Sequence, residues 1–206
     1  MSLEDEIPDV VAKAMMGLGM DAGSLADNSG ISVARIEAVL GGDSDETSLR
    51  EIASPLGLDP EALVSLSGYL PEKQEITGVG RIVLPFGQWT VNAWMVEHGG
   101  FRLLFDTGCD GDGITGALGG AMPDVVLITH AHEDHVGGVA ALESAGIRVI
   151  SETEALEAVA FDFGTISIRV VNLSGHKTPT AGYFIDGISK RLLVAGDAIF
   201  AGSIGR

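Results

Sequence analysis

Cysteine is almost missing from this chain of 206 residues, in which Cys109 is the single example. One thiol cannot build an internal disulfide framework, and such scarcity is typical of proteins from a reducing compartment. Basic residues are also few: 12 Lys and Arg stand against 29 Asp and Glu, for a formal net charge of −17. This excess of negative charge disfavours nonspecific binding to nucleic acid and adhesion to anionic membranes.

Long apolar runs are missing as well. Hydrophobic residues make up 46% of the chain, but no run approaches the roughly 18 residues that a transmembrane helix needs. The acidic start, Glu4-Asp5-Glu6, lacks the positive charge with which a secretory signal begins. We therefore expect a cytoplasmic protein with no membrane partner.

Three of the five histidines fall in one short segment, Thr129-His130-Ala131-His132-Glu133-Asp134-His135. The apolar run 125–128 before it predicts a buried strand, and residues 137–145 after it predict a helix. The segment is therefore expected to be a loop at the C-terminal end of a strand, where open α/β sheets usually place their sites.

The spacing within this loop favours a metal site over a solvated polar turn. His130 and His132 alternate, so their side chains can leave an extended segment on the same side. Asp134 and His135 come after the turn begins and can face a neighbouring position. Imidazole and carboxylate groups suit divalent ions such as zinc, iron or manganese. We predict a site for two divalent metal ions, zinc in the first place, with iron or manganese as alternatives.

Three segments together resemble the signature of the metallo-β-lactamase superfamily. They are His130-x-His132-x-Asp134-His135, Ser174-Gly175-His176 with Thr178-Pro179 behind it, and the run from Gly196-Asp197 to Gly205-Arg206. The third is most similar to the branch that contains hydroxyacylglutathione hydrolases and persulfide dioxygenases. The resemblance covers about 76–206, and it is more specific for the fold and for a metal site than for a substrate.

The resemblance implies an α/β fold, an αββα sandwich, and it assigns roles at the site. One metal would be held by His130, His132 and His176, the second by Asp134 and His135, and Asp197 would bridge both. A metal-bound hydroxide would attack the carbonyl of an ester or thioester, with Asp134 as the catalytic candidate. Tyr183 and Arg206 are candidates for contact with a small-molecule substrate.

Asp106 follows a predicted strand at 101–105 and, in the superfamily resembled, stands beside the metal loop. Its carboxylate either orients a ligating histidine through the ring nitrogen that faces away from the metal or accepts hydrogen bonds from turn amides. Both roles stay open on the sequence alone.

The chain departs from the superfamily in one respect. There the second metal usually takes a further histidine from a loop well downstream of the Gly196-Asp197 motif, and this chain stops at Arg206 without one. The second half of the sandwich is incomplete for the same reason. We expect the sequence to be a portion of a longer protein; the alternative is a depleted site that binds a single metal.

Strands are also expected elsewhere in the α/β part. The patterns that predict them lie at 81–85, 91–96, 101–105, 148–150, 165–171, 183–185 and 190–195, with a hairpin turn at 98–100 and a short helix at about 152–157. His176 and Asp197 then fall at strand ends, which places every proposed ligand on one type of loop. We expect Trp89 and Trp94 to lie in the core.

Residues 1–70 predict a small all-α domain, which a polar linker at 71–77 separates from an α/β domain at 78–206. The domain resembles the helix–turn–helix domain of phage repressors. Its expected helices run from about Glu6 to Met16 and from Asp21 to Ala26, and three more begin at the caps Ser32 and Thr47 and at Asp59-Pro60.

Charge argues against DNA as the partner of this domain. Residues 1–75 contain four Lys and Arg against fifteen Asp and Glu, a net charge of −11, and the would-be recognition helix from Ser32 to Leu40 offers only Arg35 as a base. DNA recognition needs several phosphate contacts. We therefore favour docking or homodimerisation over nucleic-acid binding.

Three functions stay open from the sequence. The first is a metal-dependent hydrolase of an ester or thioester. The second is a mononuclear iron enzyme that resembles persulfide dioxygenases. The third is a non-enzymatic sensor or transcriptional regulator that acts through the helical domain.

Overall fold

The computed structural model describes residues 5–70, 72 and 74–205. In chain order the helices and strands are α1 (Ile7–Leu18), α2 (Ala22–Ser29), α3 (Val33–Leu40), α4 (Glu46–Ala53), α5 (Pro60–Ser65), the 3-10 turn η1 (Leu66–Gly68), β1 (Val79–Phe86), β2 (Trp89–His98), β3 (Phe101–Phe105), α6 (Gly111–Leu118), β4 (Val125–Leu127), α7 (Glu133–Val136), α8 (Val139–Ser144), β5 (Arg148–Ile150), α9 (Glu152–Ala158), β6 (Ala160–Phe163), β7 (Ile166–Asn172), β8 (Ala181–Asp186), β9 (Leu192–Val194), η2 (Gly196–Ala198), β10 (Ile199–Phe200) and β11 (Ser203–Ile204).

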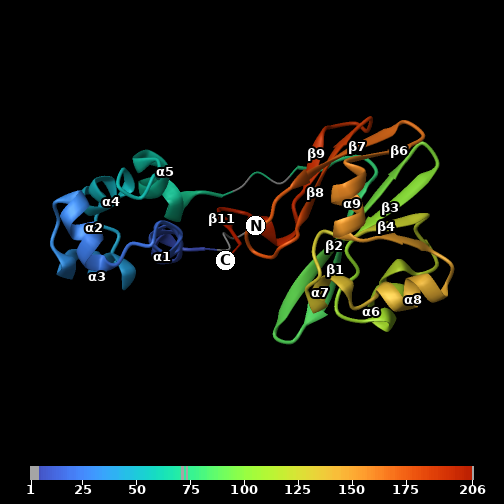
Figure 1. Cartoon of the computed structure of the whole chain (residues 1–206), viewed down its shortest axis with the longest axis horizontal. Coiled ribbons are helices and arrows are strands. Elements are labelled where there is room, and N and C mark those ends of the chain that lie inside the picture. Colours follow the sequence, from blue (N-terminus) through green and yellow to red (C-terminus); the bar gives the residue numbers. More distant parts are fainter. Residues whose placement is uncertain (1–4, 71, 73, 206) are drawn as a thin grey trace. The chain divides into compact units, whose positions relative to one another are not determined.

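The described residues form two compact units (Figure 1). The helical unit comprises residues 5–70 and 72 together with 200–204, and the α/β unit comprises 74–199 and 205. The linker expected at 71–77 includes residues 71 and 73, which lie outside the described residues.

The helical unit begins its helices with polar caps. The side chains of Asp21, Ser32 and Asp59 each accept a hydrogen bond from a backbone N–H in the first turn of α2, α3 and α5, so the predicted starts at Ser32 and Asp59 are confirmed. The fourth start is a correction. Asp45, and not Thr47, caps α4, because the Asp45 carboxylate accepts from Ser48 N at 2.9 Å. The aspartate two residues upstream therefore wins the position, as its charge also suits a helix N-terminus.

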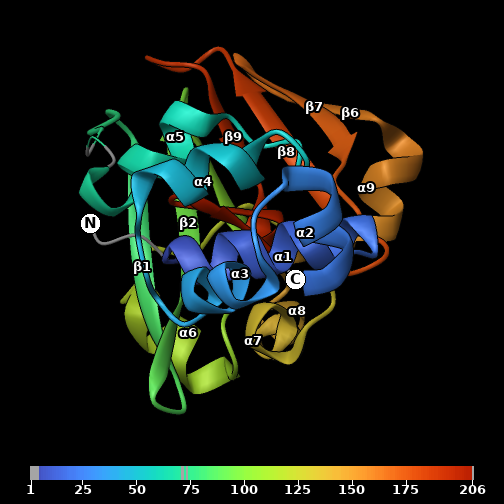
Figure 2. The same cartoon turned by 90° about the vertical axis from the view of Figure 1, so that its left-hand side faces the viewer.

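Helices α1 to α5 pack around a core of their own (Figure 2). Leu25, Ile36, Leu49 and Ile52 are fully buried there. Between α2 and α3 the chain turns at Gly30, whose φ of +80° is the left-handed conformation that glycine adopts without steric cost.

The α/β unit is built on a five-stranded sheet of order β1-β2-β3-β4-β5. Strands β1, β2 and β3 are antiparallel to one another, and β4 and β5 continue in parallel to β3. The hairpin between β2 and β3 closes on Gly99-Gly100, which both have positive φ as a two-residue turn requires. The expected turn and the strands on both sides of it are confirmed.

A second sheet packs against the first. It has the order β6-β7-β8-β9 and is antiparallel throughout. The core between the two sheets contains Leu103, Phe105, Ile168 and Tyr183. On the other face of the five-stranded sheet, α6 and α8 cover a further apolar cluster with Ile114 and Leu142 at its centre (Figure 1). The α/β sandwich expected from the sequence is thus observed.

Three details differ from expectation. Trp89 is 76% exposed rather than buried, because it pairs with Phe86 at the solvent end of the β1–β2 hairpin. Strand β6 was not expected, and neither was the four-residue helix α7 inside the metal loop. No helix in the described part of the chain is long and apolar enough to span a membrane.

Candidate metal centre

The histidine loop lies at the C-terminal ends of parallel strands. It begins directly after β4, whose last residue, Leu127, pairs with Phe105 of β3 and with Ile150 of β5. Asp106 follows β3 at the same edge, and its N–H donates to the Leu127 carbonyl at 3.1 Å. The sheet topology therefore brings Asp106 and the loop together, as expected for sites in open α/β sheets.

Three ring nitrogens converge at the first position. His132 Nδ1 lies 3.0 Å from His130 Nε2 and 3.0 Å from His176 Nε2. Ligands held at about 2.1 Å in a tetrahedral arrangement have donor atoms about 3.4 Å apart, so the three nitrogens are nearly at the spacing that a zinc ion imposes. His176 comes from the loop between β7 and β8, 44 residues away from His132.

A second group shares one of these residues. Donor atoms of His130, His135 and Asp197 all lie within 4.8 Å of one another. Asp197 stands between the two positions, since its Oδ1 is 3.3 Å from His135 Nε2 and its Oδ2 is 3.9 Å from His176 Nε2. This is the placement expected of a bridging carboxylate. Asp134 Oδ2 lies 3.7 Å from His135 Nε2, farther from this atom than Asp197 Oδ1 does. Asp134 belongs to neither group of converging donors.

Asp106 is buried behind these side chains, and it makes both kinds of contact that the sequence left open. Its Oδ1 accepts from the Thr129 N–H at 2.8 Å, which is a turn-stabilising bond. Its Oδ2 lies 2.9 Å from His135 Nδ1, which leaves Nε2 of that ring to face the site. The backbone of Asp106 has a φ of +63°, which is rare outside glycine and which aspartate and asparagine tolerate better than most residues.

Two glycines let the short helix α7 approach this strand end. A Cβ on Gly137 would collide with the backbone carbonyl of Cys109, and one on Gly138 would come within 2.8 Å of the Thr107 carbonyl. Thr107 in turn donates from both its N–H and its hydroxyl to the carbonyl of His135, at 2.8 and 2.9 Å. The loop that carries Asp106 therefore fixes the backbone of the helix that carries His135.

Burial keeps two histidines of the first group, His130 and His132, neutral. It lowers the pKa of His130 to about 4, with a further contribution from the nearby His135, and it also lowers the pKa of His132, with His176 as the second cause. A neutral imidazole has a free lone pair, so these rings are in the form that binds a metal at neutral pH.

The second position has the opposite electrostatics. Burial alone would lower the pKa of His135, but the hydrogen bond to Asp106 and the close negative charges of Asp106 and Asp197 outweigh burial and raise the pKa to about 10. Burial opposes ionisation of Asp197, yet its contact with His135 lowers the pKa of that carboxyl. In the metal-free chain the two carboxylates thus hold a positive charge at this point, which a divalent cation can replace.

The residues present fit a divalent metal. His135 Nε2 is a buried polar atom for which the described residues supply no hydrogen bond of acceptable geometry, and such atoms are rare unless a ligand or ion completes them. The donor set of imidazoles and carboxylates suits zinc and also iron or manganese. Histidines 130, 132 and 176 would hold one ion, and His135 with Asp197 would contribute to a second.

Tyr183 is a correction to the sequence analysis. It is fully buried in the core between the sheets, and its hydroxyl donates to the Ile128 carbonyl at 2.5 Å. The side chain of Tyr183 lies on the inward-facing side of β8. It therefore supports the strand before the metal loop instead of lining a substrate cleft. Arg206, the other candidate for substrate contact, lies outside the described residues.

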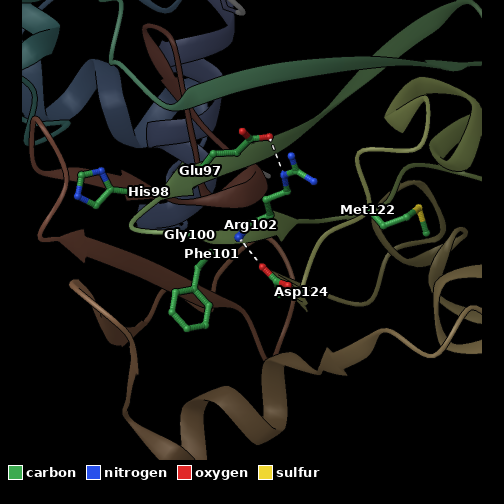
Figure 3. Close-up of a pocket in the computed structure, with 7 residues that line it drawn as sticks. All are labelled: Glu97, His98, Gly100, Phe101, Arg102, Met122 and Asp124. Atoms are coloured by element: carbon green, nitrogen blue, oxygen red, sulfur yellow. Dashed lines mark hydrogen bonds and ion pairs between the residues drawn. The ribbon is translucent and has the colours of Figure 1, made fainter.

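A separate surface pocket of about 380 Å³ lies at the opposite end of β3 and β4 (Figure 3). Arg102 is central to it, with its Nε 3.4 Å from Glu97 Oε1 and its backbone N–H donating to Asp124 at 2.8 Å. Arg102 and Glu97 thus form an ion pair, the Asp124 carboxylate is bonded to a backbone N–H, and none of the proposed metal ligands lines the pocket.

Comparison with known proteins agrees with this architecture. Residues 86–172 match the family model described as the metallo-beta-lactamase superfamily. This segment runs from the end of β1 to the end of β7 and includes the whole histidine loop. Over it, the chain has the metallo-beta-lactamase fold. Among solved structures, the BLEG-1 B3 metallo-beta-lactamase is 23% identical, with a TM-score of 0.50 over 62% of this chain and 76% of that one.

Curated relatives of this chain are named hydroxyacylglutathione hydrolase. The protein of Albidiferax ferrireducens is 31% identical over 145 residues, which are 60% of this chain and 54% of that protein. The protein of Psychromonas ingrahamii is 33% identical over 98 residues, which are 40% of this chain and 36% of that protein. The chain therefore spans about half of the first relative and about a third of the second.

Proposed function

We propose that this chain is a metal-dependent hydrolase that acts on an acyl thioester. The observation that carries the proposal is the convergence of three buried or half-buried ring nitrogens beside a second position that contains a carboxylate, all in or next to loops that follow strands. A divalent ion bound there activates water and polarises a carbonyl. The name of the relatives, hydroxyacylglutathione hydrolase, supports a thioester as the substrate.

The chain's own residues would position the reaction. Asp197 lies within reach of both His135 and His176, so its carboxylate can contribute to both positions and accept a hydrogen bond from a water molecule there. Asp134, which lies farther from the converging donors, is free to accept a proton from that water. We propose zinc as the resident ion.

The test starts with elemental analysis of the purified chain, followed by an assay of thiol release from a hydroxyacylglutathione. Bound zinc with thiol release is the expected result. A matched oxygen ester in place of the thioester measures how far the leaving group decides the rate.

The variant that tests the site is His132→Ala, which removes one of the three converging ring nitrogens and should lower metal content and thiol release. His98→Ala is its control. His98 is an exposed histidine at the far end of β2, so its loss should leave metal content and turnover unchanged. Bound iron with oxygen uptake on a persulfide, and no thiol release, would replace the hydrolase by a dioxygenase. A chain that stays metal-free under metal-replete conditions would overturn both.

For the helical unit we propose association with a second copy instead of DNA binding. The support is the state of Arg35, the base on α3. Its guanidinium pairs with Asp43 at 2.9 Å and Asp45 at 3.2 Å and donates to Ser48, so it is committed within the unit. Sedimentation of the full chain should give a dimer, and no shift of a duplex DNA pool should occur at physiological salt. A monomer that binds one DNA sequence would contradict the proposal.

A further inference from the structure

Thr129 contacts Asp106, His130 and Gly196 with its side chain. It is fully buried at the end of β4, next to His130 in the chain. Its hydroxyl lies 2.8 Å from Asp106 Oδ2 and 3.0 Å from His130 Nδ1. Its backbone carbonyl accepts from the Ala181 N–H of β8 at 2.8 Å, which ties the loop to the second sheet.

The direction of these hydrogen bonds follows from counting protons. A carboxylate only accepts, so the single proton of the Thr129 hydroxyl goes to Asp106. The hydroxyl oxygen must then accept from His130, which places the proton of that neutral ring on Nδ1. Nε2 of His130 keeps its lone pair and faces His132 at 3.0 Å.

The same carboxylate oxygen fixes the second position. Asp106 Oδ2 also accepts from His135 Nδ1 at 2.9 Å. A continuous chain of hydrogen bonds therefore runs from His130 through Thr129 and Asp106 to His135, and it turns the Nε2 atom of both rings toward the site.

Thr129 also sets the position of the turn before Asp197. A Cβ built on Gly196 would lie 2.5 Å from the Thr129 hydroxyl oxygen and 2.8 Å from its Cβ. Gly196, whose φ is +52°, therefore packs directly against the threonine side chain. The residue that presents Asp197 is located by the same side chain that orients His130.

We propose that Thr129 is the positioning residue of the metal centre: its hydroxyl selects the ring nitrogen that His130 offers, and through Asp106 it couples this choice to His135. The inference rests on the proposed function only in requiring that the histidines bind a divalent ion. It does not depend on which substrate is hydrolysed.

The first measurement is made on the metal-free full chain, with ¹⁵N-labelled histidine. Two-bond ¹H–¹⁵N correlations identify the protonated ring nitrogen, and we expect Nδ1–H for His130. In Thr129→Val, which keeps the shape and removes the hydroxyl, His130 Nδ1 loses its acceptor, and we expect the proton to move to Nε2. Thr129→Ser restores the hydroxyl and should restore Nδ1–H.

The second measurement is the zinc dissociation constant, obtained by competition with a chromophoric chelator. Removal of a group that orients a ligand typically weakens metal binding about 10- to 100-fold, and we expect that loss in Thr129→Val and less than about threefold in Thr129→Ser. Tyr183→Phe is the matched control, because it also removes a buried hydroxyl, bonded to the neighbouring Ile128 carbonyl, without touching a histidine.

The proposal is overturned if wild-type His130 carries its proton on Nε2, or if Thr129→Val binds zinc as tightly as Tyr183→Phe does. If Thr129→Val does not fold, the wild-type tautomer and the Thr129→Ser affinity still decide. Absence of thiol release with the expected tautomers and zinc affinities would reject the proposed hydrolase and leave the role of Thr129 standing.

Discussion

The helical unit and the metal loop treat polar side chains in opposite ways. Among the described residues 5–70, each Lys and Arg side chain forms an ion pair within the unit: Lys13 with Asp5, Arg35 with Asp43, and Arg50 with Glu46 and Glu61. In the loop, by contrast, imidazole nitrogens face one another: His132 Nδ1 lies 3.0 Å from both His130 Nε2 and His176 Nε2.

This difference distinguishes polar groups that stabilise the fold from polar groups that can bind a ligand. A polar group with an internal partner stabilises its own unit, whereas converging lone pairs raise the free energy of the metal-free site until a cation joins them. Such a contrast within one chain is a physical criterion for a site, and it is independent of any resemblance to other proteins.

The largest expected effect is a loss of stability in the helical unit. Leu49→Ala empties a fully buried position in the core of α1 to α5, and such a change costs about 2–5 kcal/mol. Amide hydrogen exchange in α1 to α4 should report this loss. Met16→Ala, at a position that is 68% exposed, should change exchange by less than about 0.5 kcal/mol, and equal losses would contradict the packing described.

On the metal side, His130→Ala should weaken zinc binding at the three-histidine position by at least about 100-fold, since structural zinc sites gain roughly 3 kcal/mol from each of their ligands. The measurement is chelator competition on the full chain. His98→Ala, at the exposed end of β2 far from the loop, should bind zinc as the wild type does. An unchanged affinity in His130→Ala would remove that residue from the site.

Metal removal sharpens the comparison directly. Zinc at about 100 times its dissociation constant stabilises a binding unit by about 2.7 kcal/mol. We expect this protection in the amides of β3, β4 and α7 and no change in α1 to α5, because the donors belong to the α/β unit. Equal protection of both units would show that the contrast between them is not one of ligand binding.

Asp106→Asn should lower zinc affinity about 10- to 100-fold. Asparagine tolerates the positive φ at this position, so the change removes charge with little strain. Asp124→Asn is its control, since Asp124 also accepts a backbone N–H, at 2.8 Å from Arg102 N, but lies at the opposite strand ends. If both variants lose affinity equally, the effect is not specific to the site.

The smallest effect concerns a helix start. Asp45→Ala removes the side chain that caps α4 and should cost about 1 kcal/mol of unfolding free energy, measured by urea denaturation. Thr47→Ala, at an exposed position inside the helix, should cost less than about 0.5 kcal/mol. The reverse order would restore Thr47 as the cap.

The sequence could predict what depends on local pattern. Apolar alternation located most strands, and short polar side chains located the starts of α3 and α5. The motifs singled out His130, His132 and His176, and the structure brings these residues together although they are far apart in the chain. The end of β4 was the expected place for the loop, but His176 follows β7 of the second sheet, so the packing of the two sheets is what brings it to His132.

What the sequence could not give depends on contacts between distant segments. Nothing local to Thr129 indicates that its hydroxyl reaches Asp106, 23 residues earlier. Tyr183 and Trp89 were misplaced for the same reason, since only the pairing of strands decides which face of β8 and which end of β2 meets solvent. The prediction that Thr47 caps α4 was wrong because the Asp45 side chain, two residues earlier, accepts from the first-turn amide of Ser48.

Position 106 can also be considered as a problem of choice among twenty amino acids. The backbone there has a φ of +63°, which admits chiefly glycine, asparagine and aspartate. The hydrogen bonds from Thr129 and His135 require a short side chain with two accepting oxygens and a negative charge. One filter is conformational and the other chemical, and aspartate alone passes both. In a saturation library selected for zinc binding, this position should therefore return a single residue, whereas Met16 or Thr47 should return many.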